Sequence, residues 1–333
     1  MKKIFVIILG VAFAGSAMAQ LPVSRSAAVV TSTIKGNGKN GFVGLPYTKE
    51  PVAREVVVSG SNVLTLSGSY SASSLSTPPH AVMILTGSNR GQVRRITANS
   101  GSNVTLESAI SGLTSSDELY LVPEWTVGNL FGTVALSGTL PSGIKGSNSE
   151  LTADIVFIAN ASGNLVQLFF NTSLGFWTTV GGATDQQNAR LGGLNGGCMI
   201  KRAPGTSDLT FLHQGVTRTG RQIAALAAGS ATGRFMFLTN PNTVSTTLLN
   251  SAILTNAITG GSTTTADVLY YANASGNLIQ VYYDTTASQW RTVGGVSDVG
   301  SSATTTIRPN TSLLVRKRNT SATAWTVNEN FVP

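Results

Sequence analysis

Residues 158–167 read IANASGNLVQ, and residues 271–280 read YANASGNLIQ. The two stretches stand 113 residues apart, and the same spacing joins Trp177 to Trp290 further along the chain. A match this close at a fixed spacing indicates an internal repeat. Because each copy alternates short apolar runs with turn residues, the repeat predicts modular β structure, in which function is carried by a surface rather than by one cleft.

The remainder of the chain extends this prediction to an all-β fold, with an N-terminal antiparallel β domain followed by two homologous β-sandwich-like repeats. Clusters of Gly, Ser, Thr and Asn separate apolar runs that are too short for helices. The expected units are a signal peptide at residues 1–19, an N-terminal β domain at 20–117, repeat 1 at 118–216, a connection at 217–233 and repeat 2 at 234–333.

Two local patterns describe the N-terminal domain. Residues 55–66 predict a hairpin around Ser-Gly-Ser-Asn, and residues 81–122 predict a meander with turns at 87–89 and 99–102. The second segment resembles the small β modules of phage tail proteins and other extracellular fibrous proteins. That resemblance implies a compact β barrel or sandwich and no definite ligand.

The first 19 residues have the pattern of a secretory signal peptide: two lysines, an apolar run at residues 4–14 and small residues up to Ala19. We expect cleavage after Ala19 and a location outside a bacterial cell, either secreted or on the cell surface. No later stretch approaches the roughly 18 apolar residues of a membrane-spanning helix, so no transmembrane segment is expected in the mature chain.

The charge pattern argues against specific nucleic-acid binding. Without the signal peptide the chain has 20 basic and 14 acidic residues, and the basic residues are scattered rather than gathered on one face. A weak attraction to anionic polysaccharide stays open. The single cysteine, Cys198, cannot form an intramolecular disulfide, so we expect stability to come from packing and strand pairing.

Few residues are suited to catalysis or to metal binding. His80, His213 and Cys198 are the chain's only histidines and cysteine, and its acids are thinly spread, so no cofactor is expected and no transition-metal site is indicated; a Cys198–His213 nucleophile pair is disfavoured because the second copy has neither residue. Calcium stays open at Asp185 and Asp298, which follow paired glycines at equivalent places. Asx turns, in which the carboxylate accepts a local backbone hydrogen bond, are the favoured role for both residues.

No Gly-x-Ser-x-Gly motif is present, and a hydrolase would have to rely on a pair of acids. The candidate pairs are Glu118 with Glu124 and Asp154 with Asp267. The two aspartates precede strands at matching places, which is typical of a turn or strand-start residue. We therefore expect a protein without enzymatic activity.

Five aromatic residues are the candidates for binding or assembly. Phe170, Tyr282 and Tyr283 fall in predicted strands, where one of two adjacent rings should enter the core and the other should face outward or into a neighbouring copy. Trp177 and Trp290 suit either stacking on a sugar or packing in the core, and core packing is the more common role of a tryptophan in an alternating strand.

Several short motifs resemble an uncharacterised family of exported, β-rich bacterial proteins. They are GFVGLPYTK at residues 41–49, PEWT at 123–126 with LF at 130–131, and Pro309 followed by LVR at 314–316 and WT at 325–326. The resemblance implies a secreted β protein of no established activity, and it transfers no catalytic residues.

The function that these patterns favour is a secreted or surface-associated structural or adhesive protein, with another copy of itself, matrix or polysaccharide as partner. Short β modules with few charges suit lateral association, because an exposed strand edge can pair with another chain. The alternative is a non-catalytic glycan-binding protein that uses exposed Trp and Tyr side chains.

Overall fold

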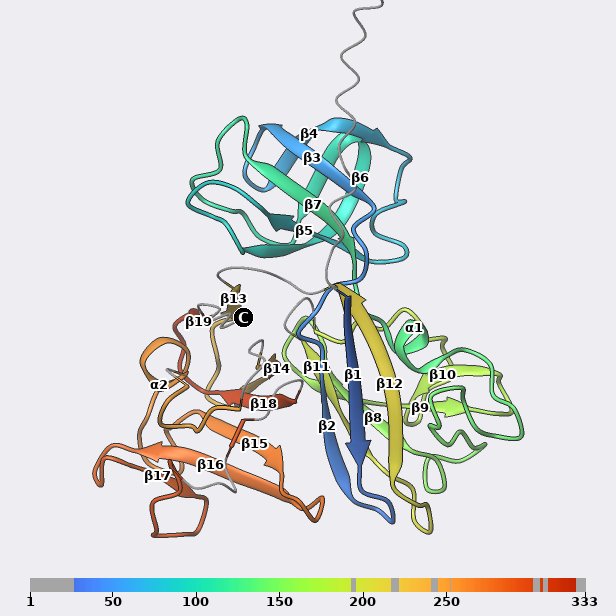
Figure 1. The fold of residues 1–333 in the computed structure, drawn as a ribbon, viewed down its shortest axis with the longest axis vertical. Helices are drawn as coiled ribbons and strands as arrows, with labels where there is room; N and C mark the ends of the chain where they lie inside the picture. Colours follow the sequence, from blue (N-terminus) through green and yellow to red (C-terminus); the bar gives the residue numbers. More distant parts are fainter. Residues whose placement is uncertain are drawn as a thin grey trace, which may run out of the picture.

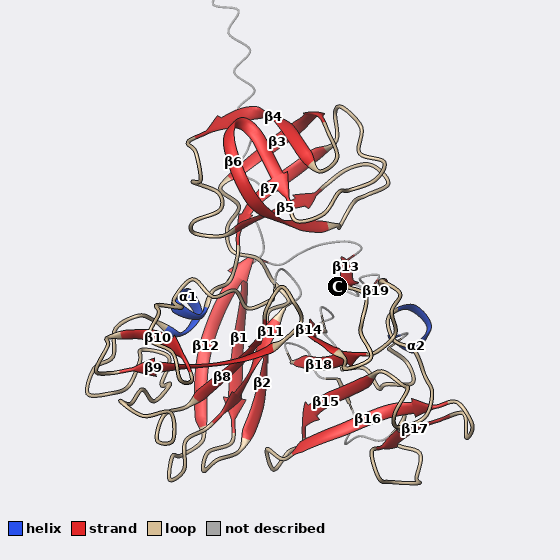
Figure 2. Cartoon of the chain, turned by 180° about the vertical axis from the view of Figure 1, so that it is seen from behind, coloured by secondary structure: helices blue, strands red, loops and turns tan. Residues whose placement is uncertain are grey.

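The structure, a computed structural model, describes residues 27–192, 196–216, 222–240, 245–251, 253–301, 306–307 and 311–327. The predicted signal peptide lies outside these residues. Within them the chain is all-β, as predicted, with two short helices (Figure 2). A closed barrel lies above two sandwiches that stand side by side (Figure 1). No helix among the described residues is long and apolar enough to span a bilayer.

The barrel closes in the order β3-β4-β6-β5-β7 around an apolar core that includes Leu64, Ile96 and Leu119. Its strands are β3 (Ala53–Ser59), β4 (Val63–Tyr70), β5 (His80–Ile84), β6 (Val93–Leu106) and β7 (Glu118–Pro123). The hairpin predicted at residues 55–66 is confirmed, because β3 and β4 pair antiparallel.

The turn predicted at residues 99–102 is wrong, because β6 continues through it. The buried Asn99 does not reverse the chain: its side chain accepts a hydrogen bond from Leu75 N (2.9 Å) and donates one to Ser71 O (2.6 Å). Gly101 has a φ of 58°, and the register between β4 and β6 shifts beside it. The turn-forming residues therefore bend one long strand and hold a neighbouring loop.

The first sandwich packs a five-stranded sheet on a two-stranded sheet. The larger sheet has the order β10-β9-β8-β11-β2. Its strands are β2 (Asn40–Gly44), β8 (Ile155–Ala159), β9 (Leu165–Asn171), β10 (Phe176–Thr179) and β11 (Gly197–Lys201). The smaller sheet pairs β1 (Ala27–Ile34) with β12 (Leu209–Val216). The helix α1 (Val127–Phe131) begins at a capping box formed by Thr126 and Asn129, and it contributes Phe131 to the shared core.

The second sandwich has the same plan. Its larger sheet has the order β14-β18-β15-β16-β17, and its smaller sheet pairs β13 with β19. The elements are β13 (Gln222–Leu226), β14 (Arg234–Thr239), α2 (Ile253–Asn256), β15 (Val268–Ala272), β16 (Leu278–Asp284), β17 (Gln289–Thr292), β18 (Ser312–Lys317) and β19 (Thr323–Val327). The two larger sheets therefore have the same strand order, read from opposite ends.

Strand pairing crosses the predicted unit boundaries. β1 and β2 precede the barrel in the chain, yet they pair with β12 and β11, which follow it. The barrel therefore stands between two parts of one sandwich, and the first sandwich uses residues on both sides of the predicted boundary at 117 and 118. β13 likewise lies in the predicted connection at 217–233 but pairs with β19.

The two five-stranded sheets also pack on each other, through the faces that point away from their own cores. Phe42 and Met199 of the first sheet meet Phe237 and Leu314 of the second, with the Phe42 and Phe237 rings 6.4 Å apart. Ser312 Oγ donates a hydrogen bond across this interface to Val43 O, at 3.0 Å. Each larger sheet is thus covered on both faces.

Each of the two repeated Asn-Ala-Ser-Gly-Asn stretches forms a backbone hydrogen bond to the opposite sandwich. Gly163 O, in the first stretch, accepts a hydrogen bond from Phe235 N of β14 (2.8 Å), and Gly276 O, in the second, accepts one from Asn40 N of β2 (2.9 Å). A Cβ on Gly163 would lie 2.8 Å from Arg234 Cβ. The motif is therefore both a hairpin turn and a contact between the sandwiches.

We predict that Gly163→Ala destabilises the protein more than Gly175→Ala does. Both glycines have positive φ, 78° and 76°, so both substitutions incur a backbone cost of about 1–2 kcal/mol. Only Gly163 faces the other sandwich, whereas a Cβ at Gly175 meets nothing within 4 Å. Urea unfolding should therefore show a further loss of about 1 kcal/mol or more for Gly163→Ala. Equal losses would show that the contact of the Gly163 turn with β14 contributes no stability.

Candidate functional site

The predicted aromatic contact residues lie mainly in the cores. Trp177 is fully buried and donates from Nε1 to Gly132 O at 2.8 Å, and its ring packs edge-on against Phe170 with centroids 6.0 Å apart. Trp290 is buried in the same way against Tyr283, with centroids 5.7 Å apart. These packed pairs leave no open tryptophan face for a sugar.

The remaining candidate, Tyr282, points to the opposite face of its sheet from Tyr283 and is also buried. Its counterpart Phe169 packs beside Ile155 on the outer face of the first sheet. The rings of each adjacent pair lie on opposite faces of the sheet, as strand alternation predicts, but the ring on the outer face, Phe169 or Tyr282, is buried rather than exposed to solvent. Tyr283, which is half-buried, is the most accessible of the five candidates.

The acids that were considered for catalysis are bound to separate cations. Asp154 is fully buried and pairs with Arg202, and it also accepts hydrogen bonds from Lys145 N (2.8 Å) and Ala203 N (2.7 Å). Both oxygens of Glu124 are bound by Arg190. Burial raises the pKa of Glu124, and the Arg190 guanidinium opposes that shift. Such contacts hold carboxylates in fixed structural positions.

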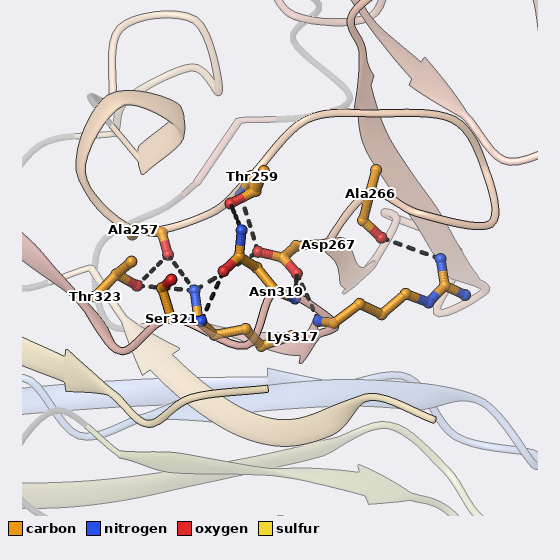
Figure 3. A network of polar contacts seen from close by, with 9 residues as sticks. Ala257, Thr259, Ala266, Asp267, Lys317, Asn319, Ser321 and Thr323 are labelled. Carbon is orange, nitrogen blue, oxygen red and sulfur yellow. Dashed lines mark hydrogen bonds and ion pairs between the residues drawn. The ribbon is translucent and has the colours of Figure 1, made fainter. Parts of the chain in front are cut away.

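Asp267 repeats the arrangement of Asp154 in the second sandwich (Figure 3). Its oxygens accept hydrogen bonds from Thr259 N (2.9 Å) and Arg318 N (2.6 Å), and the Lys317 ammonium lies 3.7 Å away. Lys317 is fully buried and donates to Ala257 O (3.1 Å), and burial lowers its pKa. Each carboxylate therefore ties the start of one strand to the end of another.

The positions considered for metal binding form turns. Asp185 accepts a hydrogen bond from Gln187 N (2.8 Å), and Asp298 accepts one from Gly300 N (2.9 Å), which are the contacts of Asx turns. Across the described part of the chain, no group of three or more His, Cys, Asp or Glu side chains is arranged to hold a metal ion. Cys198 is buried in the first core, and burial raises the pKa of its thiol.

Two open hollows of about 340 Å³ lie on the sandwiches, and their lining residues are uncharged. The first is lined by Thr133, Val134, Ala135, Gly138, Phe170, Thr172 and Gly175. The second is lined by Leu278, Ile279, Gln280, Thr292 and Val293. Neither hollow combines an acid, a base and a nucleophile, so neither has the makings of a hydrolytic site.

The sheet formed by β1 and β12 has the most distinctive surface. The strands pair over their full length, and none of their residues is Asp, Glu, Lys or Arg. Side chains alternate, so that Val29, Thr31 and Leu212 point outward. Val29 is 65% exposed and Leu212 is 70% exposed. Among the described strands, β1 pairs with β12 alone. The sheet thus presents an uncharged outer face beside an edge of β1 that pairs with no other described strand.

The inner face of the same sheet is tightly packed. Phe211 and His213 point inward from β12, and the His213 ring lies between the rings of Phe211 (5.4 Å) and Tyr47 (5.5 Å). His213 Nε2 is 2.7 Å from Ser32 Oγ of β1. A Cβ on Gly215 would lie 2.1 Å from the Tyr47 ring, so β12 needs glycine there.

Val29, Thr31 and Leu212 are not among the residues that the sequence predicts as surface contacts. Residues 27–34 begin seven residues after the predicted signal peptide, and their partner strand is about 180 residues away in the chain. The available signal was the lack of charge in both strands, together with alternation along residues 209–214. Neither signal identifies the partner strand.

We predict that Lys317→Met lowers the free energy of unfolding by on the order of 3 kcal/mol, because it leaves Asp267 buried without its cation. The matched control is Lys35→Met, which removes a lysine from the solvent-exposed ion pair with Asp208 and should cost far less. Urea unfolding of both variants measures the difference. A loss for Lys317→Met no greater than that of the control would contradict a stabilising role for the buried pair.

No protein-family model, curated protein or solved structure matches this chain. The resemblance to exported bacterial β proteins therefore stays a prediction. Two features of the structure are therefore the basis for a functional proposal. The two sandwiches cover each other's larger sheets, and the β1–β12 sheet has an uncharged outer face.

Proposed function

We propose that this protein is an exported, non-catalytic structural protein that associates with other copies of itself through the β1–β12 sheet. The observation that carries the proposal is the uncharged outer face of that sheet, with Val29 and Leu212 exposed beside the edge of β1. Backbone N–H and C=O groups on such an edge can pair with the same strand of a second copy.

The distribution of charge supports this choice of surface. Without the predicted signal peptide the chain has 20 basic and 14 acidic residues, a formal net charge of +6, so two copies repel each other when basic surfaces approach. β1 and β12 contain no charged residue. Lys35, which follows β1, and Asp208, which precedes β12, form an ion pair at one end of the sheet, and Arg25 and Arg218 stand two residues beyond the strands at their other ends in the sequence. Natural sheet edges commonly carry lysine or another charge that discourages pairing.

The alternative of glycan binding has less support. Sugar-binding sites on β scaffolds use exposed aromatic faces, and Trp177 and Trp290 are buried. The hollow beside Phe170 is lined mainly by small and aliphatic residues. A structural role needs no such site, and it agrees with the export signal predicted at residues 1–19.

We predict that Leu212→Arg weakens self-association at least about tenfold, which corresponds to 1.4 kcal/mol. The change places a charge in the centre of the proposed contact, and folding should be little affected because Leu212 is exposed. Leu249→Arg is the control. Leu249 is 63% exposed in the second sandwich, so this substitution adds the same charge at an exposed position away from the β1–β12 sheet. Sedimentation velocity over a concentration series measures the association constants.

The proposal fails if the unaltered protein is a monomer at every concentration. It also fails if Leu212→Arg and Leu249→Arg weaken association equally, because the effect would then reflect net charge rather than the β1–β12 surface. Circular dichroism of both variants establishes that the comparison is made between folded proteins.

A further inference from the structure

A single titratable side chain lies within the β1–β12 sheet. His213 is 5% exposed on the inner face of β12, with the rings of Tyr47 and Phe211 beside it. Its Nε2 atom and Ser32 Oγ, 2.7 Å apart, form a side-chain hydrogen bond between the two strands. Within the described residues, His213 Nδ1 and the Tyr47 hydroxyl have no hydrogen-bond partner.

Among the described residues, no carboxylate forms a hydrogen bond or ion pair with the His213 ring. The Lys49 ammonium lies over Trp125, whose ring packs on Tyr47, and Glu124 on the adjoining segment is bound by Arg190. Cys198 is a buried thiol in the same core, and Glu50 is exposed. Lys35 and Asp208 pair with each other at the end of the sheet. A protonated His213 ring would thus be a buried cation without a counter-ion.

We infer that His213 is an acid-sensitive latch of the β1–β12 sheet, whose protonation favours separation of β1 from β12. In the neutral state the ring fits between Tyr47 and Phe211 and links the strands through Ser32. In the protonated state the ring is stable only when it reaches water, which requires the sheet to open.

The direction of the pH effect follows from the two protonation equilibria. Desolvation lowers the pKa of His213 from 6.5 to about 4 in the closed sheet, while an opened sheet returns it towards 6.5. The stabilising contribution is therefore complete above pH 6.5 and is lost as the pH falls towards 4. Opening should increase about twentyfold between pH 7 and pH 5. Asp208 stays ionised in this range, because hydrogen bonding to Lys35 lowers its pKa.

Hydrogen exchange of the full-length protein tests the latch. We expect the protection factors of β1 and β12 amides, corrected for intrinsic exchange, to fall about twentyfold from pH 7 to pH 5. His213→Gln should abolish this fall, because glutamine can keep a hydrogen bond to Ser32 but cannot titrate. His80→Gln is the matched control: His80, in the barrel, is the chain's other histidine, and its replacement should leave the fall unchanged.

An NMR titration of the two histidine rings in the unaltered protein gives a second readout that needs no variant. A His213 ring that titrates near pH 4 supports the latch, and one that titrates at pH 6 or above overturns it. Equal pH dependence of β1 and β12 exchange in the unaltered protein and in His213→Gln also overturns it.

As a means of regulating assembly, the latch rests on the proposed self-association, yet the two can fail separately. If exchange responds to pH through His213 while sedimentation shows a monomer, the structural function fails and the latch stands. If the protein associates and the exchange of β1 and β12 does not depend on His213, the latch fails and the proposed function stands. If both hold, association should weaken from pH 7 to pH 5 in the unaltered protein and not in His213→Gln.

Discussion

The architecture depends on one constraint: each five-stranded sheet has two apolar faces, and both must be buried. One face packs on the core of its own sandwich, and the other packs on the second sandwich through Phe42, Met199, Phe237 and Leu314. Burial of apolar area on this scale is the main favourable contribution to folding. Tyr282 and Phe169, whose rings point away from their own cores, are buried as well, with Phe169 packed beside Ala153 and Ile155. The mutual covering of the larger sheets leaves the β1–β12 sheet as the one whose outer face is open in the first sandwich.

Much of the local structure could be predicted from the sequence, and most of the long-range pairing could not. The hairpins at residues 55–66, 155–170 and 268–284 follow from short apolar runs around turn residues, and all three are present. The pairing of β1 with β12 is different, because the barrel separates the partners in the chain and no local pattern records which distant strand completes an edge. The predicted boundary at residue 117 reflects the same difficulty, since a change in composition marks the barrel but does not show that the sandwich begins before it.

The candidate residues illustrate a related limit. The sequence favours core packing over sugar binding for Trp177 and Trp290 but does not decide between them, and the packed partners Phe170 and Tyr283 establish the core role. The Asn-Ala-Ser-Gly-Asn stretches were identified as turns, but their contact with the opposite sandwich depends on the placement of two sheets. The glycine of each stretch, Gly163 or Gly276, has two roles. Its positive φ forms the turn, and its lack of a side chain lets the other sandwich approach. A sequence pattern can reveal the turn but not the close approach of the other sandwich.

The same physical reasoning connects the outer and inner faces of the β1–β12 sheet. A surface that pairs with another copy must be free of charge, because a buried unpaired charge costs more than strand pairing contributes. A charge on the inner face would have the same cost, because the His213 ring is buried against Tyr47 and Phe211. The one titratable group among the residues of β1 and β12, His213, is compatible with both faces only in its neutral state. In the proposed latch, the pairing of β1 with β12 therefore depends on pH through His213 alone. The same β1 strand carries the edge that is proposed to pair with a second copy.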